Sequence, residues 1–114
     1  MTNTGRPWGP EGENSMKVPG AKPPEPGKAA RVMVDGSAVA VFNVGGALLA
    51  IDAKCTHVGG PLDQGPLNDA TVTCPWHGSQ FDLRTGSVLR GPATRPVKSY
   101  TVRVAPDGLE IEPR

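Results

Sequence analysis

The chain contains two cysteines and two histidines, and all four lie between residues 55 and 77. They form two short segments, Cys55-Thr56-His57 and Cys74-Pro75-Trp76-His77, each with one thiol and one imidazole. Thiolate sulfur and imidazole nitrogen are ligands that zinc and iron prefer in proteins. Glycines beside the segments, at residues 59, 60 and 78, allow the backbone to turn tightly and to approach a ligand closely. The candidate site residues are therefore Cys55, His57, Cys74 and His77, as ligands of a metal centre.

Three interpretations of this spacing compete. Structural cysteines with incidental histidines are disfavoured, because the chain has no other cysteine or histidine and the four are paired. A structural zinc site is possible with two cysteines and two histidines, but zinc fingers keep like ligands together and here each segment mixes them. The third interpretation is a [2Fe-2S] cluster in which two histidines replace two cysteines on one iron. The spacing favours the third, and a zinc-stapled module without a redox role is an alternative.

The two segments resemble the cluster loops of the Rieske [2Fe-2S] family. Residues 55–62 and 74–82 are similar to its first and second loops, and residues 91–93 to its proline-bearing third loop. The resemblance extends over about residues 16–112. It implies one [2Fe-2S] cluster per chain, with Cys55 and Cys74 on the inner iron. His57 and His77 would then hold the outer iron, near the surface.

Mixed ligation has an electrostatic consequence for the reaction. Two ferric ions, two sulfides and two thiolates carry no net formal charge, whereas four thiolates would leave the oxidised cluster negative. A less negative cluster accepts an electron more readily, so its reduction potential exceeds that of an all-cysteine cluster. One-electron transfer is therefore the expected activity.

Differences from the family pattern indicate which kind of Rieske protein this chain resembles. Respiratory, quinol-oxidising members have an additional cysteine in each loop, and the two form a disulfide; here these positions are Gly60 and Trp76. A tyrosine of those members is replaced by Phe81, which removes a hydrogen bond to a cysteine sulfur, while Ser79 matches their serine. Fewer hydrogen bonds to sulfur lower the potential, so we predict the lower half of the range of about −150 to +300 mV. The resemblance is to a soluble Rieske ferredoxin.

Catalysis by this chain itself is not expected. Oxygenase members of the family add a large domain with a mononuclear iron on two histidines and a carboxylate, and no histidine is left here for that site. No G-x-G-x-x-G or Walker motif is present for a nucleotide cofactor. The resemblance implies an electron-transfer component of a multicomponent oxidoreductase. It would receive electrons from a separate NAD(P)H-dependent flavin reductase and pass them to the terminal oxygenase of an aromatic-ring-hydroxylating dioxygenase. The alternative is the small Rieske subunit of an assimilatory nitrite reductase.

Composition indicates one domain with an N-terminal extension. The chain has 114 residues, and the first 27 contain 11 of its 28 glycines and prolines. We expect a flexible arm at residues 1–14 and the Rieske domain at 15–114. A net charge of +1 argues against nucleic acid or an anionic membrane as a partner. No apolar run could span a membrane and no secretory signal is visible, so a cytoplasmic location is expected. A monomeric state is a separate expectation.

The elements that must position the site are short strands. Two β-rich runs flank the hairpin dipeptide Asp35-Gly36, and alternation of apolar and polar residues marks both sides of Asp107-Gly108. No segment has a sustained helical period, so the fold class is all-β, a small antiparallel sandwich or barrel. Turn residues dominate between Asp52 and Gly91, which predicts an inserted cluster-binding subdomain. The predicted strands are 16–18, 31–34, 38–42, 47–51, 100–104 and 109–112.

Three further features are noted. Phe42 and Tyr100 are expected in the core. Trp76, between two candidate ligands, either packs in its loop or presents a flat docking surface. The stretch from Arg84 to Arg103 contains five basic residues and no acidic one after Arg84. It forms either a solvated face or a surface that steers an acidic partner.

Overall fold

A computed structural model describes residues 16–57 and 59–114. The predicted arm, residues 1–14, lies outside the described residues, and the domain boundary at residue 15 stays a prediction. The described residues form ten strands and one turn of 3-10 helix, with no α-helix among them. The elements are β1 (Met16–Pro19), β2 (Ala29–Val34), β3 (Ser37–Val44), β4 (Ala47–Asp52), η1 (Leu62–Gln64), β5 (Leu67–Asn68), β6 (Thr71–Thr73), β7 (Gln80–Asp82), β8 (Val88–Arg90), β9 (Ser99–Ala105) and β10 (Gly108–Pro113).

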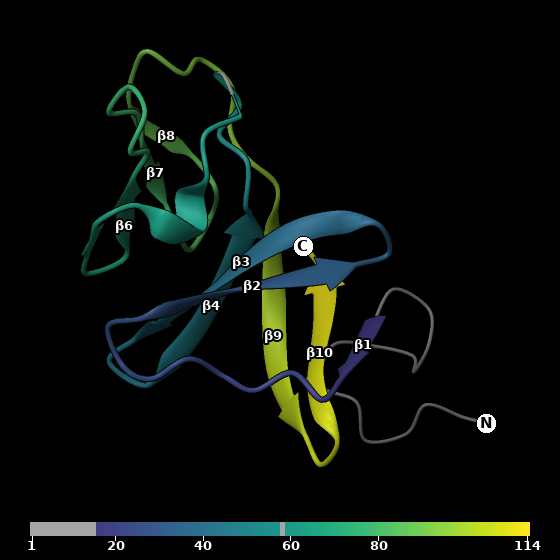
Figure 1. The fold of residues 1–114 in the computed structure, drawn as a ribbon. Helices are drawn as coiled ribbons and strands as arrows, with labels where there is room; N and C mark the ends of the chain where they lie inside the picture. Colours follow the sequence, from purple (N-terminus) through teal and green to yellow (C-terminus); the bar gives the residue numbers. More distant parts are fainter. Residues whose placement is uncertain (1–15, 58) are drawn as a thin grey trace.

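Six strands form one antiparallel sheet in the order β1-β10-β9-β4-β3-β2. The two edge strands, β1 and β2, contact each other, so this sheet curls into a nearly closed barrel (Figure 1). The remaining strands form a second antiparallel sheet in the order β5-β6-β7-β8. The all-β prediction is confirmed.

Local turn chemistry sets the barrel hairpins. Asp35 and Gly36 join β2 to β3 with φ angles of 52° and 83°, the left-handed conformations that a two-residue hairpin requires. The resulting register pairs Val34 with Ser37 and Ala29 with Phe42. A turn also joins β9 to β10, but its two residues are Pro106 and Asp107 rather than the predicted Asp107-Gly108, because Gly108 is already the first residue of β10 and pairs with Ala105.

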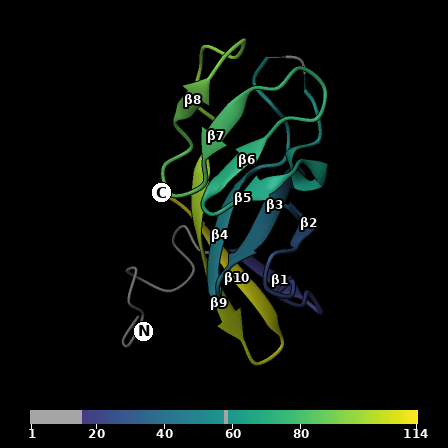
Figure 2. The same ribbon diagram turned by 90° about the vertical axis from the view of Figure 1, so that its left-hand side faces the viewer.

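The second sheet belongs to an insertion between β4 and β9, residues 53–98, hereafter the insertion. Figure 2 shows it as one end of the molecule, with the barrel below. The chain leaves the barrel at Asp52 and re-enters it at Ser99, and the Asp52 N–H donates to the Lys98 carbonyl at 2.9 Å. The Tyr100 hydroxyl donates to Asp52 Oδ1 at 2.6 Å. These bonds close the neck of the insertion and fix the direction in which it leaves the barrel.

Strand β3 is buried on both faces, which explains its continuous apolar run. Val39 and Val41 point into the barrel, where they pack in one core cluster with Ile111. Ala40 and Phe42 point to the other side, where they join a second cluster formed with the insertion. Because successive side chains of a strand alternate between faces, residues 38–42 of β3, which lie between the two cores, include no polar side chain.

An ion pair joins the two parts of the chain at the surface. Arg31 of β2 donates to Asp63 of η1 through two nitrogens, the shorter bond being 2.7 Å. The hydrogen bond to this carboxylate raises the pKa of the guanidinium above its ordinary value. The contact connects β2 to the segment that follows the first Cys/His loop.

The part of the chain that the structure describes contains no helix with the length and hydropathy needed to span a membrane.

Candidate metal centre

The first Cys/His loop, residues 55–60, follows β4 and folds on its own backbone. The Cys55 N–H donates to the Gly60 carbonyl at 2.9 Å, and the Gly59 N–H donates to the Cys55 carbonyl at 2.8 Å. Gly59 has a φ angle of 79°, a conformation that favours glycine. The glycine therefore allows the chain to return past the cysteine that begins the loop.

The second loop, residues 74–79, repeats this arrangement between β6 and β7. The Cys74 N–H donates to the Ser79 carbonyl at 2.7 Å, and the Gly78 N–H donates to the Cys74 carbonyl at 3.0 Å. Gly78 has a φ angle of 83°. Both loops thus use the same pair of backbone hydrogen bonds, although their histidines lie two and three residues after the cysteine.

The two thiols lie inside and the two imidazoles outside. Cys55 and Cys74 are 3% and 1% exposed and are not joined in a disulfide. His57 and His77 are exposed, with ring centroids 5.2 Å apart and an angle of 84° between the rings. The His57 N–H also approaches the Cys55 sulfur at 3.4 Å. The four candidate residues are therefore brought to one end of the insertion as an inner sulfur pair and an outer imidazole pair.

A third loop, residues 91–96, is attached to both others by side-chain hydrogen bonds. The Ala93 N–H donates to Ser79 Oγ at 2.9 Å, and the Thr56 hydroxyl donates to the Arg95 carbonyl at 2.7 Å. The peptide bond between Gly91 and Pro92 is cis. Ser79 is fully buried. Because its oxygen accepts the Ala93 N–H, the hydroxyl can still donate its own proton to another group. These two contacts were not predicted from the sequence, since residue spacing carries no signal for either.

Gly60 and Trp76 lie against each other beside the inner sulfur pair. A Cβ atom on Gly60 would lie 2.5 Å from Cys74 Sγ and 3.3 Å from the Trp76 ring. Only glycine fits at residue 60 without moving the cysteine. Trp76 covers this position with one part of its ring, yet 57% of the residue remains exposed.

The donor set fits a binuclear iron–sulfur group. Two thiols and two imidazoles from different loops are the ligand types of a cluster with mixed cysteine and histidine ligation. Their separation into an inner and an outer pair matches a group with two irons, each taking one kind of ligand. Within the described ranges, no three His, Cys, Asp and Glu side chains are grouped as the ligands of a single metal ion.

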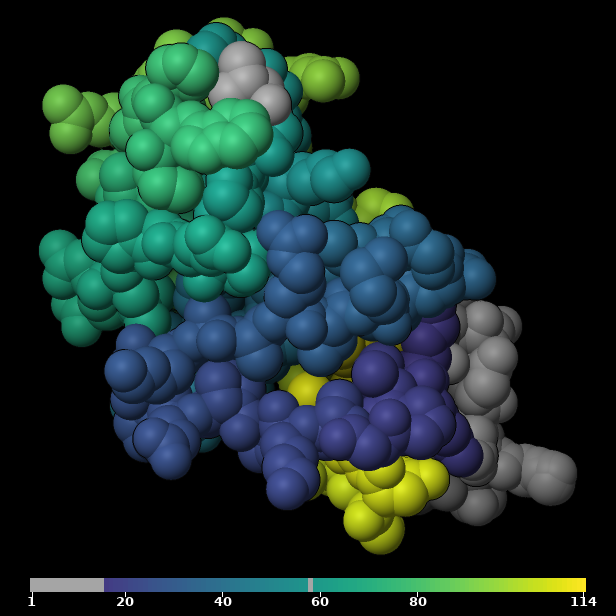
Figure 3. Space-filling model, in the orientation of Figure 1, coloured from purple at the N-terminus to yellow at the C-terminus, as the bar shows by residue number. Residues whose placement is uncertain are grey.

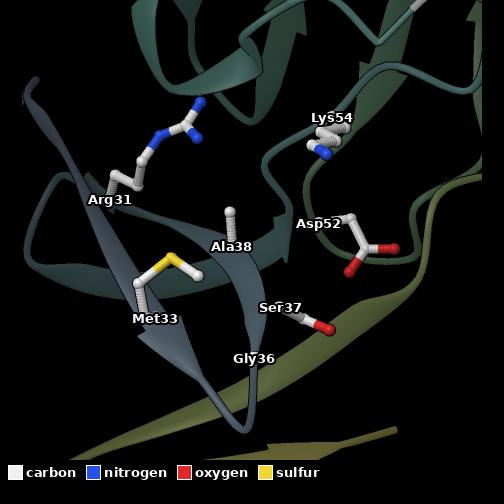
Figure 4. Close-up of a pocket in the computed structure, with 7 residues that line it drawn as sticks. All are labelled: Arg31, Met33, Gly36, Ser37, Ala38, Asp52 and Lys54. Carbon is white, nitrogen blue, oxygen red and sulfur yellow. The ribbon is translucent and has the colours of Figure 1, made fainter.

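An open groove lies apart from these residues, between the barrel and the start of the insertion (Figure 4). Its volume is about 430 Å³. Figure 4 shows Arg31 and Lys54 on either side and Ala38 between them. Its lining is completed by Met33, Gly36, Ser37 and Asp52. None of the four candidate ligands contributes to the groove.

Comparison with known families decides between the interpretations of the site. A family model described as the Rieske [2Fe-2S] domain matches residues 15–101. The chain belongs to the Rieske family. Its cofactor is accordingly a [2Fe-2S] cluster, and the zinc-stapled alternative is set aside.

Individual relatives agree with this membership. The 3-phenylpropionate/cinnamic acid dioxygenase ferredoxin subunit of Escherichia coli (strain K12) is 44% identical over 75 residues, which are 65% of this chain and 71% of that protein. The ferredoxin of carbazole 1,9a-dioxygenase from Nocardioides aromaticivorans IC177 superimposes with a TM-score of 0.73 at 30% identity, covering 87% of this chain and 96% of that one.

A third match comes from the complex of reduced oxygenase and oxidized ferredoxin in carbazole 1,9a-dioxygenase. One of its chains has a TM-score of 0.76 and 31% identity, covering 88% of this chain and 94% of that one. The relatives are named as ferredoxin subunits, which places this Rieske domain with electron-transfer components rather than with catalytic enzymes.

Proposed function

We propose that Cys55 and Cys74 hold the inner iron of the [2Fe-2S] cluster and that His57 and His77 hold the outer iron. The observation that supports this assignment is the burial of both sulfurs beneath two exposed imidazoles 5.2 Å apart. The bound cluster supplies one-electron chemistry. The chain's own part is to exclude water from the sulfur side and to present the imidazole edges to a partner.

The chain passes single electrons from an NAD(P)H-dependent flavin reductase to the terminal oxygenase of a dioxygenase system, each a separate protein. Two findings support this role: the similarity to dioxygenase ferredoxin subunits, and the structural match within an oxygenase–ferredoxin complex. They also favour the carrier over the small subunit of an assimilatory nitrite reductase. The cytoplasmic location and the monomeric state stay predictions.

The ligand assignment is tested by electron paramagnetic resonance before and after reduction with dithionite. The oxidised protein should be silent. The reduced protein should give a rhombic signal with an average g-value below that of all-cysteine clusters. The His77→Ala variant should lose this signal, whereas Gln80→Ala, a change in strand β7 that removes no candidate ligand, should keep it. An unchanged reduced spectrum from His77→Ala would refute the ligand set.

The carrier role is tested by reconstitution with the reductase and terminal oxygenase of the same organism. Oxygenated product should form only when NAD(P)H, both enzymes and this chain are present, and His77→Ala should not replace the wild-type chain. Tight co-purification with a large sirohaem- or flavin-bearing partner would instead indicate a nitrite reductase subunit.

A further inference from the structure

The three loops at the cluster end of the insertion carry positive charge only. Residues 54–60, 74–80 and 90–96 comprise these loops and their immediate neighbours. They contain Arg90 and Arg95, together with Lys54, which lines the groove near Asp52 at the start of the insertion, and no aspartate or glutamate. Exposed basic residues are usually balanced by nearby acids on a protein surface, so an acid-free region around an electron-exit site calls for an explanation.

Two of these cations are fixed beside the Cys/His loops by backbone contacts. The Arg95 carbonyl accepts the Thr56 hydroxyl at 2.7 Å, which places Arg95 against the loop of Cys55 and His57. Arg90 pairs with Gln80 across β7 and β8, at the residue after the second loop ends. Both arginines are exposed. The backbone of each arginine therefore lies beside one of the two loops that carry the exposed imidazoles.

The acids of the insertion are held elsewhere. Asp63 is bound to Arg31 of the barrel at 2.7 Å. Asp82 pairs with Thr71, at the end of β6 opposite to Cys74, and Asp69 lies in the turn just before Thr71. Among the described residues, none of these carboxylates forms an ion pair with Arg90 or Arg95, and Asp63 is already paired with Arg31.

The net charge of the insertion is also more positive than that of the whole chain. The insertion carries five basic and three acidic side chains, a formal charge of +2, against +1 for the full chain. The positive charge is therefore concentrated in the part that bears the Cys/His loops, which forms one end of the molecule (Figure 3). Such an asymmetry orients a diffusing protein before contact and raises its association rate with a surface of opposite charge.

The second loop adds an exposed aromatic residue. Trp76, between Cys74 and His77, is 57% exposed, and Pro92 of the third loop is exposed as well. An exposed aromatic side chain with charged residues on adjoining loops is common in protein docking surfaces.

We infer that the surface formed by Trp76, Arg90, Pro92 and Arg95, on the loops next to His57 and His77, docks onto an acidic patch of the electron acceptor, the terminal oxygenase of the proposed function. The inference rests on the proposed function and adds the sign of the partner's surface. Opposite charges bring the partner to the imidazole edges, where the path for the electron is shortest, and the tryptophan excludes water from the contact.

The field at this surface is measured by stopped-flow oxidation of the reduced protein with two inorganic probes of opposite charge. Each transfer moves one electron: hexacyanoferrate(III) becomes hexacyanoferrate(II), or tris(phenanthroline)cobalt(III) becomes the cobalt(II) complex, and the cluster returns to its oxidised state. Raising the ionic strength from about 0.01 to about 0.15 M shortens the screening length from about 30 to about 8 Å. The rate with the anion should fall about threefold or more, and the rate with the cation should rise.

Charge-reversal variants test whether Arg90 and Arg95 produce the positive potential at this surface. The double variant Arg90→Glu, Arg95→Glu should invert both salt dependences. The matched control Arg84→Glu, Lys28→Glu makes the same change in net charge at an exposed hairpin turn of the insertion and at an exposed site before β2, and should leave both dependences in their original direction. Equal effects of the two double variants would overturn the inference, because overall charge would then explain the rates.

A polymer probe tests docking of an acidic surface itself. Poly-L-glutamate should slow the oxidation of the wild-type protein by the cobalt complex at low ionic strength, and poly-L-lysine should not. The polyglutamate effect should vanish in Arg90→Glu, Arg95→Glu and persist in the control variant. A reduced protein that ignores both polymers would refute the docking surface, whereas a protein that forms no reducible cluster would refute the proposed function.

Discussion

The barrel and the insertion are built on different physical principles. The barrel has strands of four to eight residues, each satisfied by a neighbouring strand over most of its length. The strands of the insertion have only two or three residues, and its three loops depend on isolated hydrogen bonds such as Ala93 to Ser79. The barrel therefore supplies stability without chemistry. The insertion has little regular structure, and its three loops lie together where the cluster is proposed to bind.

Removal of the iron is the change that should separate the two regions most strongly. Metal ligation contributes folding free energy to the segments that hold it. Chelation of the reduced protein should therefore release the Gly59 and Gly78 amides to rapid hydrogen exchange, while Val41 of β3 and Ile111 of β10 stay protected. The measurement is amide exchange followed by mass spectrometry or NMR, which resolves local from global opening.

An untreated His77→Ala protein serves as the matched control, because it should give the same exchange pattern without exposure to the chelator. Equal loss of protection in the barrel and the insertion would show a single cooperative unit. That outcome would contradict the division of roles described above.

Two neighbouring glycines of the first loop sharpen the comparison at a smaller scale. Gly60→Ala would place a Cβ atom 2.5 Å from Cys74 Sγ, so the inner sulfur must move. A Cβ on Gly59 meets no atom within 4 Å, and its cost is the left-handed φ angle of 79°, about 1–2 kcal/mol. We expect Gly60→Ala to lose most of its iron and acid-labile sulfide and Gly59→Ala to keep both. The contents per chain and the visible absorption measure this directly.

If both variants retained full iron, the close approach of Gly60 to Cys74 would have no bearing on cluster binding. If both lost it, backbone strain in the loop rather than contact with the sulfur would be the deciding factor.

The barrel could be predicted from the sequence better than the insertion. The barrel hairpin at Asp35-Gly36 was predictable because adjacent residues encode it, and Phe42 and Tyr100 are buried as expected. The strands β5 to β8 were not predicted, since two or three residues are too few to display a period. Their pairing depends on packing against residues distant in the sequence.

The candidate site shows the same limit. Its four candidate residues were predicted from residue type and spacing, and the depth of Cys55 and Cys74 relative to the histidines agrees with what the family resemblance implied. The hydrogen bond from Thr56 to Arg95 spans 39 residues and depends on the fold of both loops. The basic residues were visible as a stretch, but only the topology separates Arg90 and Arg95 from Arg84.

The smallest effect is predicted for a substitution at the neck between the barrel and the insertion. Tyr100, the only tyrosine of the chain, is buried and donates to Asp52 Oδ1. Burial, together with the hydrogen bond and the charge of Asp52, raises the pKa of this phenol above its ordinary value. Tyr100→Phe should lower the free energy of unfolding at neutral pH by about 1 kcal/mol, the net value of one hydrogen bond.

The pH dependence of this contact gives the sharper test. A raised pKa in the folded state means that the phenol's contribution is fully present below the unfolded value of about 10 and is lost as the pH rises through the folded value. The wild-type free energy of unfolding should therefore fall more steeply above pH of about 10 than that of Tyr100→Phe, and the two curves should converge. Urea denaturation of both proteins across this range measures the difference, in which the common titration of lysines cancels. Parallel curves would show that the hydroxyl ionises equally in both states, and that the neck is held by the backbone bond from Asp52 to Lys98 alone.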